Sequence, residues 1–170
     1  MPPEPHFDLT ELDFGRVLAD QAAIRGVNPQ RFEMEQLTAI LHNDAQTQMI
    51  VGYKDVRDDE FWVRGHMPNY PIMPGVLMCE AAAQLCSFYI VTQGLLQGDF
   101  IGFGGLEDVR FRGLVRPGDR LVLVGKAKRI HRRQTIFNVQ GFVGDKMVFE
   151  ADVIGVPMNR QGSAAPGQEG

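Results

Sequence analysis

One stretch of the chain, from Pro74 to about Gln93, is apolar on almost every side of a helical wheel. Such a pattern predicts a helix that is surrounded by the rest of the protein. Proline is favoured at a first helical position and glycine after the last one, so Pro74 and Gly94 mark the expected ends. At 1.5 Å per residue the helix is about 27 Å long, enough to cross a small domain.

Three polar residues, Glu80, Gln84 and Ser87, interrupt this helix at spacings that place them on one stripe. A carboxylate at Glu80 is costly among apolar neighbours unless it has a partner. We expect Gln84 to brace Glu80, with direct contact between Gln84 and a substrate as the alternative. Because Glu80 and Gln84 lie in its interior, the stretch is not expected to span a membrane.

Strand patterns dominate the second half of the chain. The ranges that predict strands are 100–112, 120–130, 134–143 and 147–156, with turns at 116–119 and 144–146. Ahead of the helix, residues 48–56 predict another strand, after a turn at Asn43-Asp44. Long antiparallel strands beside one buried helix predict an α+β domain in which the sheet wraps the helix.

The first forty or so residues give weaker patterns. Residues 8–27 are expected to be mostly helical, because apolar residues recur at roughly helical spacing at Leu12, Val17, Leu18, Ala22 and Ile24. Residues 32–41 fit neither period clearly. The ends, residues 1–7 and 158–170, are rich in proline or in small and polar residues, so we expect disordered tails around a single domain at 8–157.

Composition and charge narrow the function classes. The chain has 170 residues and a mass of 19.0 kDa, which suits one domain. Its formal net charge of -4 argues against bulk electrostatic binding to nucleic acid or to an anionic membrane. Cys79 and Cys86 lie two helical turns apart, too far for a disulfide, and Met1–Pro5 has neither the basic region nor the apolar run of a signal peptide. We therefore expect a reducing, cytoplasmic setting.

The candidate chemistry lies in the segment from Arg64 to Val76, which leads directly into the apolar helix. It contains three prolines and two glycines in thirteen residues, so its backbone is stiff. The segment places His66 shortly before the helix. It also puts Gly75 in the first turn, where backbone N–H groups lack partners and the helix dipole favours negative charge. Gly75 is therefore a candidate donor to a developing oxyanion.

Taken alone, each of these residues has an ordinary structural explanation. A loop histidine is usually structural, a buried glutamate is usually tied to an amide or an arginine, and a glycine here is usually a turn residue. Together, His66, Glu80 and Gly75 provide an acid/base pair with an oxyanion donor. Ser87 and the two cysteines lie in the helix body with no paired base, which disfavours an acyl-enzyme and favours proton transfer next to a carbonyl.

Two stretches of the sequence stand out together. The first is Gly65-His66-Met67-Pro68-Asn69-Tyr70-Pro71-Ile72-Met73-Pro74-Gly75-Val76-Leu77, continued by Glu80-Ala81-Ala82-Ala83-Gln84, and the second is Arg110–Asp119. They resemble the signature segments of the hotdog-fold 3-hydroxyacyl-[acyl-carrier-protein] dehydratases of type II fatty-acid synthesis, and the resemblance covers about residues 28–156. Met67 stands where the family usually has phenylalanine, and Asn28-Pro29-Gln30-Arg31 departs from the family's Pro-His-Arg segment. These differences, with a longer N-terminal region, leave a specialised lipid or polyketide pathway open.

The resemblance implies a hotdog fold, a curled antiparallel sheet wrapped around one long central helix. It implies a homodimer with shared active sites, with a trimer of dimers left open. The implied reaction is dehydration of 3-hydroxyacyl thioesters on an acyl carrier protein to trans-2-enoyl thioesters. Across the dimer interface, His66 would remove the α-proton and Glu80 would support proton transfer to the departing hydroxyl. The Gly75 amide, with Val76 and Gln84 beside it, would bind the thioester carbonyl, and neither a metal nor an organic cofactor is implied.

One cluster of basic residues is relevant to the question of a protein partner. It consists of Lys126, Lys128, Arg129, His131, Arg132 and Arg133. A solvated hairpin end is the simpler explanation, and a docking surface for an acidic acyl carrier protein is the more specific one. For that surface the candidates are Lys128, Arg129, Arg132 and Arg133, with Arg110, Arg112 and Arg116 as competitors. Two other functions stay open from the sequence: a hotdog thioesterase, which uses a carboxylate and water, and a non-catalytic acyl-binding module.

Overall fold

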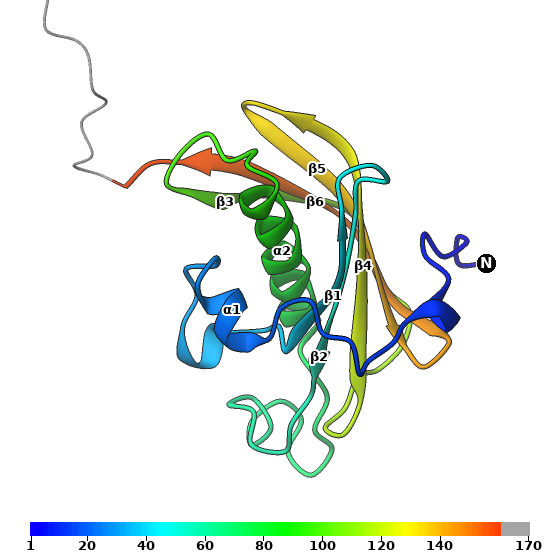
Figure 1. Ribbon diagram of the computed structural model, residues 1–170. Coiled ribbons are helices and arrows are strands. Elements are labelled where there is room, and N and C mark those ends of the chain that lie inside the picture. Colours follow the sequence, from blue (N-terminus) through cyan, green and yellow to red (C-terminus); the bar gives the residue numbers. More distant parts are fainter. Residues whose placement is uncertain (161–170) are drawn as a thin grey trace, which may run out of the picture.

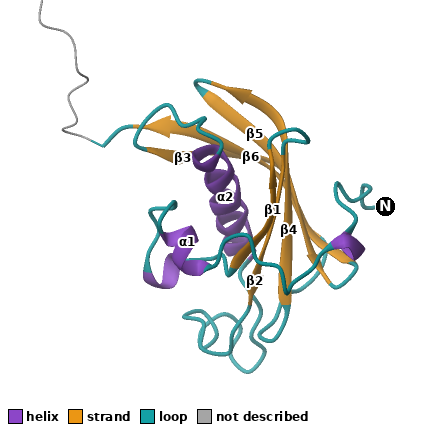
Figure 2. Ribbon diagram, viewed as in Figure 1, coloured by secondary structure: helices purple, strands orange, loops and turns teal. Residues whose placement is uncertain are grey.

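The computed structural model describes residues 1–160, and within them one antiparallel sheet curls around one long helix (Figures 1 and 2). The strands pair in the order β1-β2-β4-β5-β6-β3. Their bounds are β1 Ala39–Asp44, β2 Met49–Asp55, β3 Phe100–Phe111, β4 Arg120–His131, β5 Gln134–Val143 and β6 Lys146–Met158. The helices are α2 Gly75–Thr92, α1 Gln21–Arg25 and two 3-10 turns, η1 Leu9–Glu11 and η2 Phe32–Met34. The expected α+β architecture is confirmed.

Most of the strands lie where the sequence predicts them. The strand expected at 134–143 has those bounds, and the four expected at 48–56, 100–112, 120–130 and 147–156 differ from β2, β3, β4 and β6 by one or two residues at an end. The turn expected at Asn43-Asp44 follows β1 instead, at residues 45–48. The unclear segment at 32–41 contains η2 and the first residues of β1.

The helix α2 packs against the concave face of the sheet and supplies much of the core. Leu85 and Ile90 are completely buried. Tyr89 meets Phe137 of β5 edge to face, with ring centroids 5.4 Å apart. By length and composition alone α2 could cross a membrane, but 67% of it is buried inside the protein. It is therefore a core helix, as its all-round apolar pattern predicts.

The close approach of α2 to the sheet depends on Gly52 in β2. A Cβ atom at this position would lie 2.8 Å from the carbonyl oxygen of Ala39 and 2.9 Å from Leu85 Cδ1. Because a packed core leaves no room for such contacts, a larger residue would push the helix away from the sheet. The glycine thus sets the depth at which α2 lies, and with it the position of the polar residues on the helix.

The expectation of a mostly helical region at 8–27 is wrong. Only η1 and α1 are helical there, and Ala19 forms an antiparallel bridge with Ile40 of β1. The apolar residues that gave the helical spacing belong to two separate cores. Leu12 packs on the outer face of the sheet, whereas Ile24 packs on the inner face with α2. The chain passes around the sheet between these two positions (Figure 1).

The first residues of the chain contact the outer face of the sheet. The backbone N–H of His6 donates to Gln140 Oε1 at 2.9 Å, and the His6 ring Nε2 lies 2.7 Å from Asn138 Oδ1. Phe7 packs with the apolar cluster on that face. The tail expected at 1–7 is therefore attached to the sheet at His6 and Phe7. Of the tail expected at 158–170, Met158 belongs to β6, and residues 161–170 lie outside the described part of the chain.

Candidate active site

His66 is held by its own loop, which connects β2 to α2. Its backbone N–H donates to the carbonyl of Trp62 at 2.7 Å, and its ring Nδ1 lies 2.8 Å from the carbonyl oxygen of Ile72. Because a carbonyl can only accept, Nδ1 carries a proton, and in the neutral ring Nε2 is the nitrogen with the lone pair. Buried Trp62 and a hydrogen bond from the Met73 N–H to the Val115 carbonyl attach the loop to the core. The loop therefore fixes the orientation of the His66 ring.

Gly75 begins α2 and offers an unpaired amide. Within residues 1–160 its backbone N–H makes no hydrogen bond. A Cβ atom at Gly75 would lie 2.8 Å from ring atoms of Phe111, the last residue of β3, so any side chain here would displace that ring. Val76, the next residue, is 74% exposed. The start of an 18-residue helix is thus left open, with the dipole and an amide that an oxyanion site needs.

Glu80 is oriented by Gln84, one helical turn further along α2. Gln84 Nε2 donates to Glu80 Oε1 at 2.8 Å and to the carbonyl of Met34 at 2.6 Å. Gln84 Oε1 accepts from the backbone N–H of Gln36 at 2.9 Å. Gln84 is only 2% exposed, so its amide has little surface left for a substrate. These contacts are those of a brace, which ties Glu80 to the segment before β1.

Glu80 lines a cavity of about 250 Å³ between α2 and the sheet. The other lining residues come from four elements and from the segment before η2: Pro29, Gln30, Ala83, Cys86, Ser87, Phe100, Ile101, Gly102, Phe103, Thr135, Val153, Ile154 and Gly155. A largely apolar cavity with one carboxylate in its wall fits a ligand that has a long apolar part and a polar reacting end. The sequence did not predict the walls from β3, β5 and β6.

Within residues 1–160 of one protomer, no hydrogen bond or ion pair joins His66 to Glu80. Their hydrogen bonds go to different partners, the Ile72 carbonyl and the Gln84 amide. Glu80 lies beside the first residues of β3, whereas Gly75, at the end of the His66 loop, touches the last residue of β3. The two candidate groups therefore occupy separate positions along the line where α2 runs next to β3.

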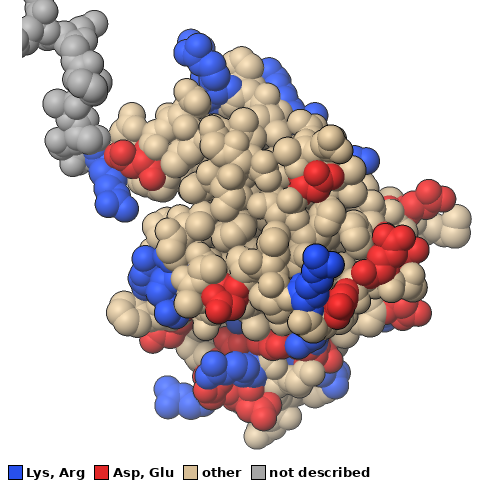
Figure 3. Space-filling model, in the orientation of Figure 1, with Lys and Arg blue, Asp and Glu red and all other residues tan. Residues whose placement is uncertain are grey.

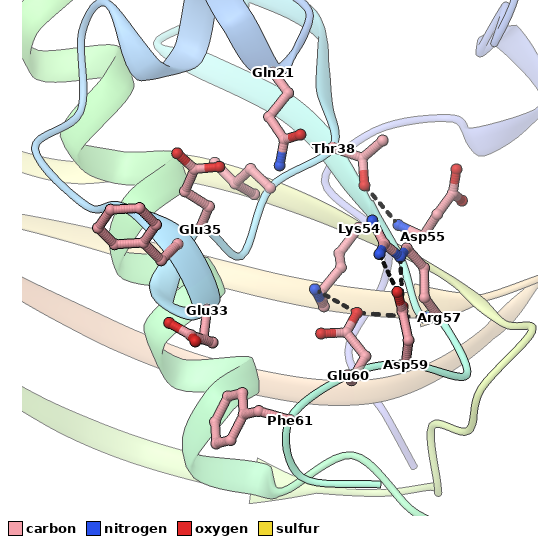
Figure 4. Close-up of a pocket in the computed structure, with 12 residues that line it drawn as sticks. Gln21, Glu33, Glu35, Thr38, Lys54, Asp55, Arg57, Asp59, Glu60 and Phe61 are labelled. Carbon is pink, nitrogen blue, oxygen red and sulfur yellow. Dashed lines mark hydrogen bonds and ion pairs between the residues drawn. The ribbon is translucent and has the colours of Figure 1, made fainter.

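A larger cavity of about 530 Å³ lies between the end of β2 and the loop that follows it (Figure 4). None of the site residues predicted from the sequence lines it. Lys54, only 5% exposed, points toward Glu60 and pairs with it at 2.9 Å. The other ion pairs made by its wall residues are Glu35–Arg25, Asp55–Arg120 and Asp59–Arg57. Because these charges are paired, we assign the cavity a structural role in fixing the start of the His66 loop.

The basic residues of the hairpin lie far from that loop. Arg129, Arg132 and Arg133 are at or next to the β4–β5 turn, and basic side chains gather along this edge in Figure 3. Lys128 differs from them because its Nζ donates to buried Asp152, which raises the pKa of Lys128. The other end of β4 lies next to the His66 loop. At about 3.3 Å per residue, the two ends of this strand are roughly 35 Å apart.

Arg116 contacts the His66 loop directly. Its guanidinium lies over the ring of Tyr70, 4.3 Å from the ring centroid, and donates to the Tyr70 hydroxyl. Arg112, in contrast, pairs with Glu150 at 2.9 Å. Among the arginines that compete with the hairpin, Arg116 is therefore the one tied to the candidate site.

The described residues offer no other obvious catalytic group. Within residues 1–160 no three His, Cys, Asp or Glu side chains are placed to hold a metal ion. Cys79 and Cys86 are both buried, and burial raises the pKa of each thiol. Neither is therefore available as the thiolate that nucleophilic catalysis needs. His66 and Glu80 therefore stay the candidates for proton transfer.

Comparisons with known sequences identify relatives of this chain. Residues 28–152 match the family model described as a FabA-like domain. A 3-hydroxyacyl-[acyl-carrier-protein] dehydratase FabZ from Syntrophobacter fumaroxidans is 39% identical over 140 residues, which cover 79% of this chain and 91% of that protein. The protein of the same name from Moorella thermoacetica is 34% identical over 135 residues, which cover 79% of this chain and 94% of that protein.

Solved structures share the fold at low sequence identity. The dehydratase heterocomplex ApeI:P from Xenorhabdus doucetiae matches with a TM-score of 0.65 at 11% identity, over 81% of this chain and 91% of that chain. The PaaI protein of E. coli, from the phenylacetic acid degradation operon, matches with a TM-score of 0.55 at 14% identity, over 69% and 80%. These likenesses confirm the hotdog fold, and with the sequence matches they confirm the resemblance: the chain belongs to the FabA-like family that includes the 3-hydroxyacyl-[acyl-carrier-protein] dehydratases.

Proposed function

We propose that this protein is a lyase that dehydrates 3-hydroxyacyl thioesters, carried on an acyl carrier protein, to trans-2-enoyl thioesters in fatty-acid or related lipid biosynthesis. The relatives described above are named for this reaction and match most of the chain. In this chain the observation that carries the proposal is Glu80, oriented by Gln84, in the wall of a largely apolar cavity. A 3-hydroxyacyl group has the matching form, because its reacting end is polar and the rest is apolar.

Each candidate residue has one task in this reaction. Nε2 of His66 removes a proton from the carbon next to the thioester carbonyl. The Gly75 N–H donates to the carbonyl oxygen as that oxygen gains negative charge, and Val76 contacts the thioester beside it. Glu80, in its carboxylic acid form, gives its proton to the 3-hydroxyl and becomes a carboxylate, the carbon–oxygen bond breaks, and water leaves as the carbon–carbon double bond forms. Gln84 acts on the reaction only through Glu80, as a positioning residue.

A second copy of the chain would bring His66 to Glu80, and the free edge of β3 is where it fits. In the described sheet β3 is the end strand, and it carries exposed Phe103, Leu106 and Phe111. The strand also exposes Glu107, Asp108 and Arg110, but a long end strand with unpaired backbone groups and exposed apolar side chains can pair with another chain. Antiparallel pairing of two β3 edges about Leu106 would set Phe111 of one copy opposite residue 101 of the other. The Gly75 and His66 region of one copy would then approach the Glu80 cavity of its partner, and a trimer of such dimers stays open.

The acyl carrier protein would bind next to this shared site through basic residues. Arg116 favours one location, because it contacts the His66 loop. The β4–β5 hairpin is roughly 35 Å from the His66 loop of the same copy, measured along β4. A carrier protein bound at the hairpin would therefore reach only a site that includes a second copy of the chain. Charge reversal separates the two: the variant that contains the docking residue raises KM for the carrier-bound thioester and leaves KM for a pantetheine thioester unchanged. Arg116→Glu tests the first location, and the double variant Arg132→Glu/Arg133→Glu tests the second.

The function is tested with purified protein and 3-hydroxyacyl thioesters of several lengths, followed at the absorbance of the enoyl product. Wild type should form the enoyl thioester, and His66→Ala and Glu80→Ala should each abolish its formation. His131→Ala, which removes an exposed histidine from the hairpin, serves as the matched control. Release of free thiol without an enoyl product would indicate a thioesterase instead, and ligand binding without turnover would indicate an acyl-binding module. A cytoplasmic location stays a prediction.

A further inference from the structure

Two largely buried residues with hydroxyl side chains, Ser87 and Thr135, line the cavity beside Glu80. Ser87 of α2 and Thr135 of β5 both line it and are only 5% and 6% exposed. Neither side chain makes a hydrogen bond within residues 1–160. Thr92 shows the usual alternative for a hydroxyl on a helix, because it donates to the carbonyl of Phe88 at 2.7 Å. Ser87 makes no such bond to its own helix.

The surroundings of both hydroxyls direct them toward the cavity. Ser87 lies on the same stripe of α2 as Glu80 and Ala83, which also line the cavity. Thr135 Oγ1 lies 2.8 Å from the position that a Cβ atom would take at Gly155. Since Gly155 lines the cavity too, its missing side chain leaves the Thr135 oxygen open to the interior. Neither oxygen is among the fully enclosed unpartnered polar atoms of residues 1–160, so both are open to the cavity and can bond to a polar group of a ligand that enters it.

The end of the cavity away from Glu80 is polar as well. At Pro29, Ser87 and Phe100 it shares its wall with a second hollow of about 200 Å³. That hollow also has charged residues in its lining: Arg25, Arg31, Asp99 and Arg160. In Figure 3 the surface is hollowed between α1 and the ends of β3 and β6. A chain with a methyl end would leave both hydroxyls unsatisfied and would point toward charged groups.

We propose that the acyl chain of the substrate carries a second oxygen, as a hydroxyl or carbonyl group, and that Ser87 and Thr135 bind it. This inference rests on the proposed dehydration, because it places the acyl chain in the Glu80 cavity. Ser87 follows Glu80 by seven residues, about 10 Å along the helix. An extended chain covers that length with roughly eight zigzag carbon–carbon bonds of about 1.5 Å each. If carbon 3 lies at Glu80, the second oxygen is therefore expected near carbon 10 or 11.

The test compares two kinds of thioester in the same dehydration assay. One is 3-hydroxydodecanoyl-N-acetylcysteamine, and the other is the same compound with an added hydroxyl at carbon 10 or carbon 11. For wild type, kcat/KM should be about tenfold higher for at least one of the dihydroxy compounds than for 3-hydroxydodecanoyl-N-acetylcysteamine. This ratio is measured in the unaltered protein, so it does not depend on whether a variant folds.

Variants then test whether the hydroxyls of Ser87 and Thr135 cause this ratio of the two kcat/KM values. Ser87→Ala and Thr135→Val should each lower it about fivefold, and the double variant should bring it close to one. Thr92→Val, a hydroxyl on the same helix outside the cavity, should leave the ratio unchanged. A ratio of one or less in wild type, or an unchanged ratio in the double variant, would overturn this inference while leaving the dehydration intact. Turnover of neither compound would overturn the dehydration and this inference with it.

Discussion

Replacing Gln84 with methionine tests how the site is held together. The change keeps most of the side-chain volume and removes both polar atoms. The N–H of Gln36 then loses its acceptor, and Gln36 is completely buried, so no water replaces it. One buried donor left unpaired costs about 1–3 kcal/mol. The Met34 carbonyl and the Glu80 carboxylate also lose a donor, but both residues are partly exposed and each adds at most about 1 kcal/mol.

The free energy of unfolding of Gln84→Met is therefore expected to fall by about 2–4 kcal/mol. Urea unfolding at one fixed protomer concentration measures it, because assembly makes the stability depend on concentration. The matched control is Gln93→Met near the end of the same helix, where one bond of 3.1 Å to Asn43 is lost. That change should stay within about 0.5 kcal/mol.

The same variant separates the role of Gln84 in stability from its role in positioning Glu80. At a temperature where Gln84→Met is fully folded, kcat should fall by roughly tenfold to a hundredfold, because Glu80 is no longer fixed. KM should change much less, since the apolar cavity is intact. A variant as stable and as active as wild type would refute the assignment of Gln84 as the brace of Glu80.

Two further predictions concern the ion pairs of the large cavity. Lys54→Met should lower the free energy of unfolding by about 3–5 kcal/mol, because the side chain of Glu60 is only 12% exposed and would keep an unpaired charge. Adding Glu60→Gln should restore most of that loss, and no recovery in the double variant would contradict the argument. Hydrogen bonds from Arg25 hold the pKa of Glu35 below its ordinary value of 4.5. A carboxylate whose pKa is lower in the folded protein than in the unfolded chain stabilises the fold at pH values above its unfolded-state pKa. This stabilisation is lost as the pH falls through its folded-state pKa. Unfolding curves should therefore show Arg25→Ala less stable than wild type at about pH 7, with the difference shrinking as the pH falls below about 4.5, and a difference that does not shrink in acid would contradict the assignment.

The parts of the fold that could be predicted from the sequence are those whose whole signal is local. The helix α2 has its apolar pattern, Pro74 and Gly94 within one stretch, and β4, β5 and β6 are separated by recognisable turns. The bond between Glu80 and Gln84 follows from their spacing of four residues on a helix. The proline-rich loop before α2 likewise indicated where the candidate site lies, because its residues form one continuous stretch of the sequence.

The other features depend on contacts between distant segments. Leu12 and Ile24 have helical spacing but face opposite sides of the sheet, so the periodicity combined two cores into one false helix. The cavity at Glu80 takes Phe103 from β3 and Thr135 from β5, which meet only because β6 lies between these strands in the sheet. The contacts of Gln84 with the backbone at Met34 and Gln36 likewise join segments about fifty residues apart. No local pattern contains that information.

Subunit complementation tests the shared site most directly. His66→Ala and Glu80→Ala proteins, each inactive alone, are mixed and allowed to exchange protomers. A mixed dimer then holds one site with both residues intact and one with both replaced. Random exchange puts half of the dimers in this form, so activity should return to about one quarter of the wild-type value. If the two residues act within one protomer, the mixture stays inactive after exchange, and the proposed pairing of His66 with Glu80 of the partner subunit is contradicted.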